Sequence, residues 1–281
     1  MNVSPEWADT RSATLRGRIA VTLALAAASL RSEFQYRANA ILSVIGGIIY
    51  QLTGFVVVWI IVDRFTDLGG WNLSQIAFLY GMRLTSHGIF YATISQMFEI
   101  DRVLINGEYD RFLVRPMSPL VQVLTRKLRV NCFGDLIGGV ALLTVASQGV
   151  EVDWSLVALG LLLAAVVGGA LIEGAVQIAL GSLAFRFLQL SMMQVTVNEV
   201  FNIYGNYPSR IFPNLVQYLL TFALPVAFVA YLPASVILDQ TGGLHVSTAL
   251  AWGAPLIGVA LFALALRVWG RMSRQYQSAG N

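Results

Sequence analysis

The chain has 281 residues, of which 57% are hydrophobic and only 12% are charged, and its formal net charge is +3. A soluble domain usually has about a quarter of its residues charged, so this composition excludes a soluble protein and indicates an integral membrane protein. Each helical span takes about 20 residues, which leaves room for about six spans and excludes a large extramembrane catalytic domain. Cys132 is the single cysteine, which excludes a disulfide framework and a cysteine-based metal site. We therefore predict an all-α polytopic membrane protein.

The N-terminal part, residues 1–37, is predicted to be a cytoplasmic segment that contains an interfacial helix. Its apolar stretch, residues 19–30, is too short to cross a bilayer. Arg16 and Arg18 before this stretch and the alanines at 26–28 near its end would also suit a signal peptide. We favour an uncleaved helix that lies along the cytoplasmic interface, with its arginines reaching the lipid headgroups.

Residues 38–281 are predicted to form one transmembrane domain, because no repeat or linker divides them. Five apolar stretches are typical of membrane spans: 38–62, 75–99, 130–147, 155–185 and 248–268. Tryptophans near the ends of these stretches suit an aromatic belt at the membrane surface. They are Trp59, Trp71, Trp154 and Trp269.

The region before the last span has two apolar stretches, 187–205 and 211–238. Hydropathy favours the second stretch as the fifth span, but Pro213, Pro225 and Pro233 interrupt it, and proline kinks or ends a helix. We favour 187–205 as the fifth span and 211–238 as a re-entrant helical hairpin on the outer side. Hydropathy alone leaves the opposite assignment open.

The distribution of charge predicts the orientation. All basic residues except Arg64, Arg83 and Arg210 lie on the same side as the termini if the number of spans is even. The positive-inside rule then places the N- and C-termini in the cytoplasm, so only one of the two ambiguous stretches crosses. The predicted location is the cytoplasmic (inner) membrane of a bacterium. The low net charge gives no reason to expect a nucleic-acid partner.

Motifs for catalysis are missing from the sequence. It contains no Gly-x-x-x-x-Gly-Lys-Ser/Thr loop, no His-Glu-x-x-His pair and no Gly-x-Ser-x-Gly elbow. We therefore predict no catalytic residue, no metal site and no enzymatic activity in this chain.

Ionisable side chains inside the predicted spans are the first candidate site, since a charge in a membrane needs a partner, water or a cavity. Arg83 and His87 are four residues apart and share one helical face. Glu173 lies in the fourth span, and Glu199 lies near Asn202 in the ambiguous stretch. The depths of Arg83 and Glu199 match, which predicts an ion pair that fixes helix register or borders a substrate path. A proton relay through Glu173, Glu199 and His87 would instead suit a proton-coupled secondary transporter.

The cytoplasmic loop at 101–129 is the second candidate site. It combines charges of both signs with aromatic residues, as a short amphipathic helix that docks onto a soluble partner would. Gly107 permits a turn before this helix, and Pro116 and Pro119 end it. The alternatives are a helix that rests on lipid headgroups and a membrane scaffold that recruits a soluble protein. The candidate residues are Gly107, Glu108, Tyr109, Asp110, Arg111, Phe112, Arg115 and Pro116.

Two segments carry a resemblance to a known family. Residues 107–119, which contain Leu-Val-Arg-Pro at 113–116, resemble the cytoplasmic loop of permease subunits of ABC-2 type ABC transporters. The match is to a six-span branch whose loop ends in Leu-x-Arg-Pro. Residues 206–213 and 224–234 are similar to the segment before the last span of this family. The resemblance extends from about residue 30 to 274.

This resemblance implies that the loop is a coupling helix on an ATP-binding subunit, with Arg111, Phe112 and Arg115 as the docking contacts. It also implies two separate ATP-binding subunits, which would carry ATP and Mg, and no cofactor in this chain. The membrane part would be a dimer with a second copy or with a paralogous permease. Substrates of the family range from drugs and antibiotics to lipids and polysaccharides, and they are usually exported.

Overall fold

The computed structural model describes residues 15–65, 68–187 and 189–276, so the first 14 residues of the predicted N-terminal segment lie outside the described residues. Within the described residues all longer elements are helices, and one isolated bridge pairs Leu68 with Trp71. The all-α class is therefore confirmed.

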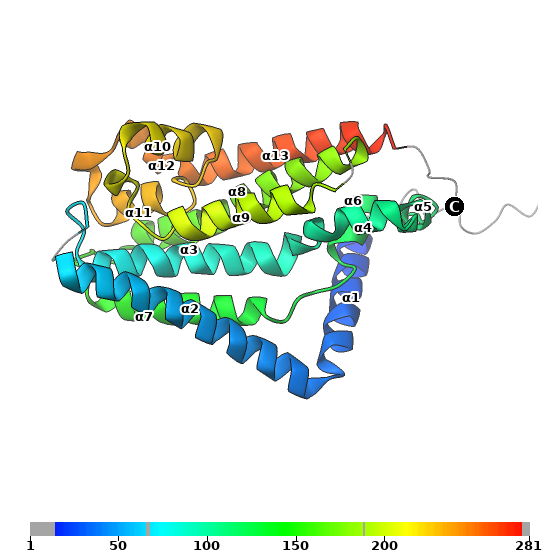
Figure 1. Cartoon of the computed structure of the whole chain (residues 1–281), viewed down its shortest axis with the longest axis horizontal. Helices are drawn as coiled ribbons and strands as arrows, with labels where there is room; N and C mark the ends of the chain where they lie inside the picture. Colours follow the sequence, from blue (N-terminus) through cyan, green and yellow to red (C-terminus); the bar gives the residue numbers. More distant parts are fainter. Residues whose placement is uncertain (1–14, 66–67, 188, 277–281) are drawn as a thin grey trace, which may run out of the picture.

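Long helices lie side by side and alternate in direction along the long axis of the molecule (Figure 1). They are α2 (Arg37–Phe65), α3 (Leu73–Ile94), α7 (Cys132–Gln148), α8 (Leu156–Ser182), α9 (Ser191–Tyr204) and α13 (Ala254–Ser273). Among the described residues, three helical segments are long and apolar enough to cross a membrane: Arg37–Val57, Leu156–Phe185 and Ala254–Ser273. Helix α9 has 14 residues, about 21 Å at ~1.5 Å per residue, and is shorter than a bilayer core of ~30 Å.

Helix α3 is the central helix. It begins with a capping box, in which the Asn72 side chain accepts from the Gln75 backbone N–H and the Gln75 side chain accepts from the Asn72 N–H. All residues from 76 to 88 are buried, which shows that α3 is covered on every side. The approach of α7 is so close that a Cβ on Gly81 would lie 2.7 Å from the backbone nitrogen of Leu143. Glycine is required here because any side chain would push the two helices apart.

Helices α8 and α13 also meet through glycine. A Cβ on Gly168 would lie 2.7 Å from the Cα of Pro255, and one on Gly258 would lie 2.5 Å from the Gly168 carbonyl oxygen. Small residues at such positions let two helix backbones pack directly against each other. This contact joins α13 firmly to α8.

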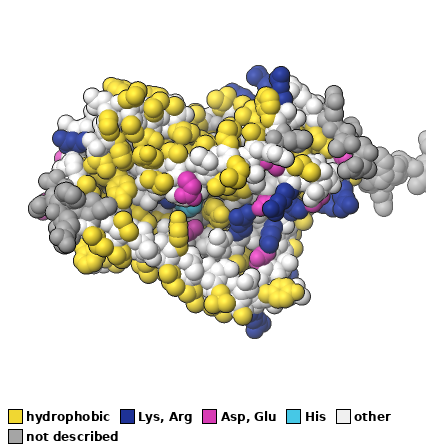
Figure 2. All heavy atoms as spheres, viewed as in Figure 1, with side chains coloured by type: hydrophobic (Ala, Val, Ile, Leu, Met, Phe, Trp, Pro, Cys, Tyr) yellow, Lys and Arg dark blue, Asp and Glu magenta, His cyan; other side chains and the backbone are white. Residues whose placement is uncertain are grey.

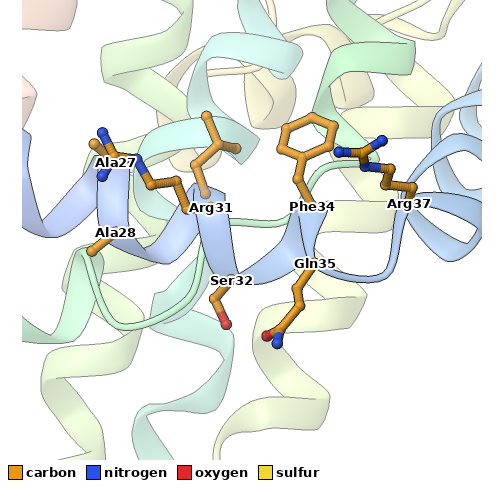
Figure 3. A pocket seen from close by; sticks show the side chains of 8 residues that line it. Ala27, Ala28, Arg31, Ser32, Phe34, Gln35 and Arg37 are labelled. Carbon is orange, nitrogen blue, oxygen red and sulfur yellow. The ribbon is translucent and has the colours of Figure 1, made fainter.

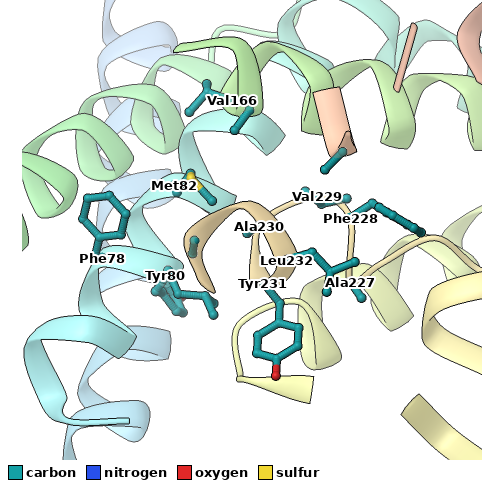
Figure 4. Close-up of a cluster of buried hydrophobic side chains, with 14 of the residues drawn as sticks. Phe78, Tyr80, Met82, Val166, Ala227, Phe228, Val229, Ala230, Tyr231 and Leu232 are labelled. Carbon is teal, nitrogen blue, oxygen red and sulfur yellow. The ribbon is translucent and has the colours of Figure 1, made fainter. Parts of the chain in front are cut away.

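Short helices gather at one end of the bundle (Figure 1). They are α10 (Asn214–Tyr218), α11 (Tyr231–Ile237) and α12 (Thr248–Trp252). The helix that starts with α10 continues as a π-helical turn, Leu219–Ala223, and stops before Pro225. Residues 226–232 then pack, buried, against α3 and α8 (Figure 4). Thus α9 runs along the bundle, whereas both arms of the 211–238 segment stay at one end.

The other end carries α1 (Leu15–Phe34), which lies across the bundle, and the short helices α4 (Ile100–Ile105), α5 (Glu108–Leu113) and α6 (Pro119–Leu124) (Figure 1). The bend between α1 and α2 borders a shallow, open hollow of about 750 Å³. Figure 3 shows Arg37 beside Phe34 in this hollow, with Ser32 and Gln35 on the other side of the chain.

The tryptophans only partly match the predicted aromatic belt. Trp59 and Trp154 are exposed, as a belt requires. Trp71 and Trp269, by contrast, are buried, with exposed fractions of 1% and 5%. The prediction is wrong for these two because each ring packs on another aromatic ring: Trp71 lies 5.8 Å from Tyr231, and Trp269 lies 5.0 Å from Phe185.

Candidate functional site

The first candidate site is the α5 platform, which we define as residues 105–116. Gly107 has a φ of 66°, a left-handed conformation that glycine adopts at low cost, and α5 begins directly after it. Helix α5 ends at Leu113, and Pro116 follows in the exposed turn. The predicted turn and short helix are confirmed, but Pro119 opens α6 instead of ending α5.

Two aromatic side chains anchor the α5 platform to the bundle. Tyr109 is completely buried. The centroid of its ring lies 5.1 Å from the ring centroid of Phe185 and 4.9 Å from that of Tyr276. Phe112 is 8% exposed and belongs to the same cluster. Burial raises the pKa of Tyr109 to about 12, so its phenol is neutral at physiological pH. Phe185 follows α8 and Tyr276 follows α13, so α5 contacts the ends of both helices.

Polar contacts brace the same region. Glu108 forms an ion pair with Arg126 at 2.9 Å. The side-chain amide of Gln122 donates to the carbonyl oxygens of Phe112 and Met117, at 3.0 and 3.1 Å. Asp110 is half-buried. These contacts hold the turn between α5 and α6 in one shape.

The outer face of the α5 platform differs from the predicted docking contacts. Arg111 and Arg115 are exposed, whereas Phe112, the third predicted docking contact, is buried and does not lie on the outer face. Helical spacing places Phe112 on the inner face, three residues after Tyr109. Leu113 and Val114, which are 53% and 84% exposed, take its place on the outer face. Val114 follows Arg111 by three residues, so helix periodicity could have identified it.

The second candidate site is a buried charged cluster. The His87 Nδ1 atom of α3 lies 2.7 Å from the Glu173 Oε2 atom of α8. Arg83, one turn before His87, has its Nη2 atom 4.0 Å from the other oxygen of Glu173. All three side chains are at least nine-tenths buried. The cluster therefore joins α3 to α8 through charge.

The predicted ion pair between Arg83 and Glu199 is wrong. Arg83 donates to the Asn202 side chain at 2.6 Å, and Asn202 donates to Glu199 at 3.3 Å, so an amide separates the two charges. The matching depths of Arg83 and Glu199 did not identify the partner of Arg83, because depth in the membrane does not tell which way a side chain points around its helix axis. Glu173 faces α3 at the same level, whereas Glu199 is exposed on the surface of α9.

Beside this cluster lies a polar cavity of about 510 Å³. Residues of α2, α3, α7 and α9 line it. The side-chain amide of Gln51 donates to Asp135 at 2.7 Å inside it. Its charged or aromatic lining residues are Tyr50, His87, Tyr91, Asp135 and Glu199. No lysine or arginine among the described residues lines it.

The polar cavity continues toward the end of the bundle that carries the α5 platform. A second hollow of about 350 Å³ shares Tyr91, Asn198 and Glu199 with it and extends to Glu99 and Arg129. Glu99 is paired with Arg129 at 3.0 Å, so charges of both signs border this mouth. In the described part of the chain, no three His, Cys, Asp or Glu side chains are grouped so that they could hold a metal ion.

Comparison with known proteins places this architecture in a family. The chain matches the family described as ABC-2 family transporter protein over residues 48–280, from within α2 to beyond α13. No curated protein matches the chain. The family comprises multi-pass permeases, which are the membrane components of ABC transporters and generally work with ATP-binding subunits. The chain therefore belongs to the ABC-2 family of transporter proteins.

Proposed function

We propose that this chain is the permease subunit of an ATP-driven exporter and that the outer face of the α5 platform binds an ATP-binding subunit. One observation carries the proposal: Arg111, Val114 and Arg115 are exposed, while Tyr109 and Phe112 anchor the same short helix in the bundle. A loop that only joined two helices would need neither the buried anchors nor the exposed apolar side chains. Exposed apolar residues flanked by arginine are typical of protein interfaces.

The six long helices are then the spans, with the bilayer thinned around the short α9, and both termini lie in the cytoplasm of a bacterium. Basic side chains gather near the end of the molecule that carries the α5 platform, as Figure 2 shows, and the positive-inside rule favours this end as cytoplasmic. The 211–238 segment would be a re-entrant hairpin that enters from the outer side. Its buried residues 226–232 and its prolines support that assignment.

Coupling would run from the α5 platform into α8 and α13. ATP and Mg²⁺ would be bound by two partner subunits, whose closure moves α5. Tyr109 contacts Phe185, and Phe185 contacts Trp269 at 5.0 Å, so a shift of α5 presses on the ends of both helices. Because α8 also carries Glu173, the same shift would reach the polar cavity.

The polar cavity would be part of the substrate path. A second permease, either another copy or a paralogue, would complete this path. The bend between α1 and α2 would rest on lipid headgroups, since Arg31 and Arg37 line its hollow and form no ion pair among the described residues.

Co-purification tests this proposal. The tagged chain is co-expressed with its genomic neighbours, purified in mild detergent and assayed for ATP hydrolysis. We expect an ATP-hydrolysing subunit to co-elute with the chain. The double variant Arg111→Glu, Arg115→Glu should no longer retain this subunit. Arg210→Glu is the matched control, since Arg210 is exposed near the opposite end of the bundle. This variant should still retain the ATP-hydrolysing subunit. A folded chain that elutes alone would contradict the proposal.

A further inference from the structure

The polar cavity presents acceptors and negative charge without a cation. Asp135 and Glu199 both line it, and neither forms an ion pair with any described residue. The nearby arginine, Arg83, is already placed against Glu173 and Asn202. Carboxylates inside a membrane protein need water or a cation as a partner. The described residues that line the cavity therefore include two carboxylates and no lysine or arginine, while Arg129 borders only the adjoining hollow, where it is paired with Glu99.

Within the described residues, two side chains in the cavity wall each bond to the protein through one polar atom and keep another free. His87 is 5% exposed, and its Nδ1 atom is held by Glu173, while its Nε2 atom has no hydrogen-bond partner among the described residues. Asp135 is 8% exposed, and only one of its oxygens accepts a bond from Gln51. Both residues line the cavity, so these two polar atoms are available to a ligand that enters it.

Apolar and aromatic surfaces border the acidic cavity. Tyr50 and Tyr91 line it, and the face of Tyr91 already accepts a cation, since the Arg129 guanidinium lies 5.7 Å from the ring centroid. Figure 2 looks onto this side of the molecule, where acidic side chains and the histidine lie in the middle and apolar side chains surround them. Ile49 of α2 and Val195 of α9 are exposed apolar side chains on two of the helices that line the cavity.

From these observations we propose that the polar cavity binds a hydrophobic organic cation, with Asp135 and Glu199 balancing its charge. The cationic centre lies between the two carboxylates and the Tyr50 ring, and the apolar body rests on the exposed side chains of α2 and α9. This inference rests on the proposed function and specifies its substrate class. The cavity volume of about 510 Å³ is within the usual range for small-molecule sites.

Two probes of equal shape and opposite charge provide the test. The full chain, in lipid nanodiscs, is dialysed against radiolabelled tetraphenylphosphonium or tetraphenylborate, and empty nanodiscs correct for partition into lipid. We expect saturable binding of the cation only. Glu199→Gln should weaken it at least about tenfold, because one charge-balancing contact is lost. Saturable binding of tetraphenylborate with equal affinity would overturn the proposal.

Controls separate charge in the cavity from charge elsewhere. Glu151→Gln removes an exposed carboxylate outside the cavity, and the cation should bind that variant unchanged. Asp135→Asn should also weaken binding about tenfold. If that variant fails to fold, Glu199→Gln decides, since its side chain is exposed and its loss leaves the packing intact. Unchanged binding to Glu199→Gln would overturn the proposal.

Two outcomes separate this inference from the proposed function. An ATP-hydrolysing subunit that co-purifies with a chain unable to bind the cation would overturn the substrate class and leave the permease role standing. In the other outcome, the chain shows saturable, Glu199-dependent cation binding and captures no ATP-hydrolysing subunit. That result would support the cation site and contradict the permease role. If Glu199→Gln converts a dimer to a monomer and no cation binds, the carboxylate serves a subunit interface, and the proposal is overturned.

Discussion

The Glu173 carboxylate lies 2.7 Å from His87 Nδ1, and this contact joins α8 to the central helix α3. The Arg83 Nη2 atom lies 4.0 Å from the other oxygen of Glu173, an ion pair without a hydrogen bond. Since Arg83 and Glu173 are both buried, each of these two charges depends on the other for balance. Because His87 also lines the polar cavity, its contact with Glu173 lies at the edge of that cavity.

Replacing Glu173 should destabilise the protein strongly. Glu173→Gln keeps the shape of the side chain but leaves Arg83 buried without a counter-charge, which costs about 3 kcal/mol. Unfolding in detergent, followed by circular dichroism, measures the change. Glu199→Gln is the matched control and should cost less than about 0.5 kcal/mol, as expected for an exposed residue. Equal losses from both variants would contradict the assignment of Glu173 as the partner of Arg83.

Phe112 and Val114 should have separate effects. Phe112→Ala removes a buried ring from the aromatic cluster and should destabilise the α5 platform by about 3 kcal/mol. Limited proteolysis of the loop detects that loss. Val114→Ala leaves stability unchanged because its side chain is 84% exposed. It should instead weaken capture of the ATP-binding subunit, which a pull-down at several concentrations quantifies. A stable Phe112→Ala variant would show that the ring does not anchor α5.

Capture of the ATP-binding subunit should depend on salt. Arg111 and Arg115 are exposed, so their attraction to an acidic partner surface is screened as ionic strength rises. The association rate should fall between low and physiological salt, and surface plasmon resonance measures it. Arg111→Gln with Arg115→Gln should bind more slowly and lose most of this dependence. The same salt dependence in that variant would place the electrostatic contact elsewhere.

Two glycines of α8 form a matched pair. Gly168→Ala forces a Cβ to 2.7 Å from Pro255 and should cost about 1–3 kcal/mol through overpacking. A Cβ on Gly160 meets nothing within 4 Å, so Gly160→Ala should stabilise the helix by up to about 1 kcal/mol. Melting temperatures of the two variants give the comparison. A stable Gly168→Ala variant would mean that α8 and α13 are not in direct contact.

Local features of this fold could be predicted from the sequence. The helices α3, α7, α8 and α13 lie close to the predicted apolar stretches, because continuous apolar runs and their caps act over a few residues. The turn at Gly107 was predicted for the same reason: its backbone conformation is set by one residue and its neighbours.

Contacts between helices were harder to predict. The sequence placed Arg83 and Glu199 at one depth, but the partner of Arg83 depends on how α8 and α9 rotate about their axes, which spacing within one helix does not determine. Trp269 looked like a surface anchor, and only the tertiary position of Phe185 explains why it is buried. Phe112 is a different case, because its spacing from Tyr109 already indicated the inner face.

Site-specific cross-linking at Val114 tests the central claim most directly. The single native cysteine, Cys132, is buried, so Val114→Cys supplies the accessible thiol for a cysteine-to-lysine cross-linker. Leu156→Cys, at the opposite end of the bundle and 90% exposed, is the matched control. With co-expressed genomic neighbours present, we expect an adduct between this chain and an ATP-hydrolysing subunit from position 114 alone. No adduct from position 114, or equal adducts from both positions, would contradict an ATP-binding subunit seated on the α5 platform.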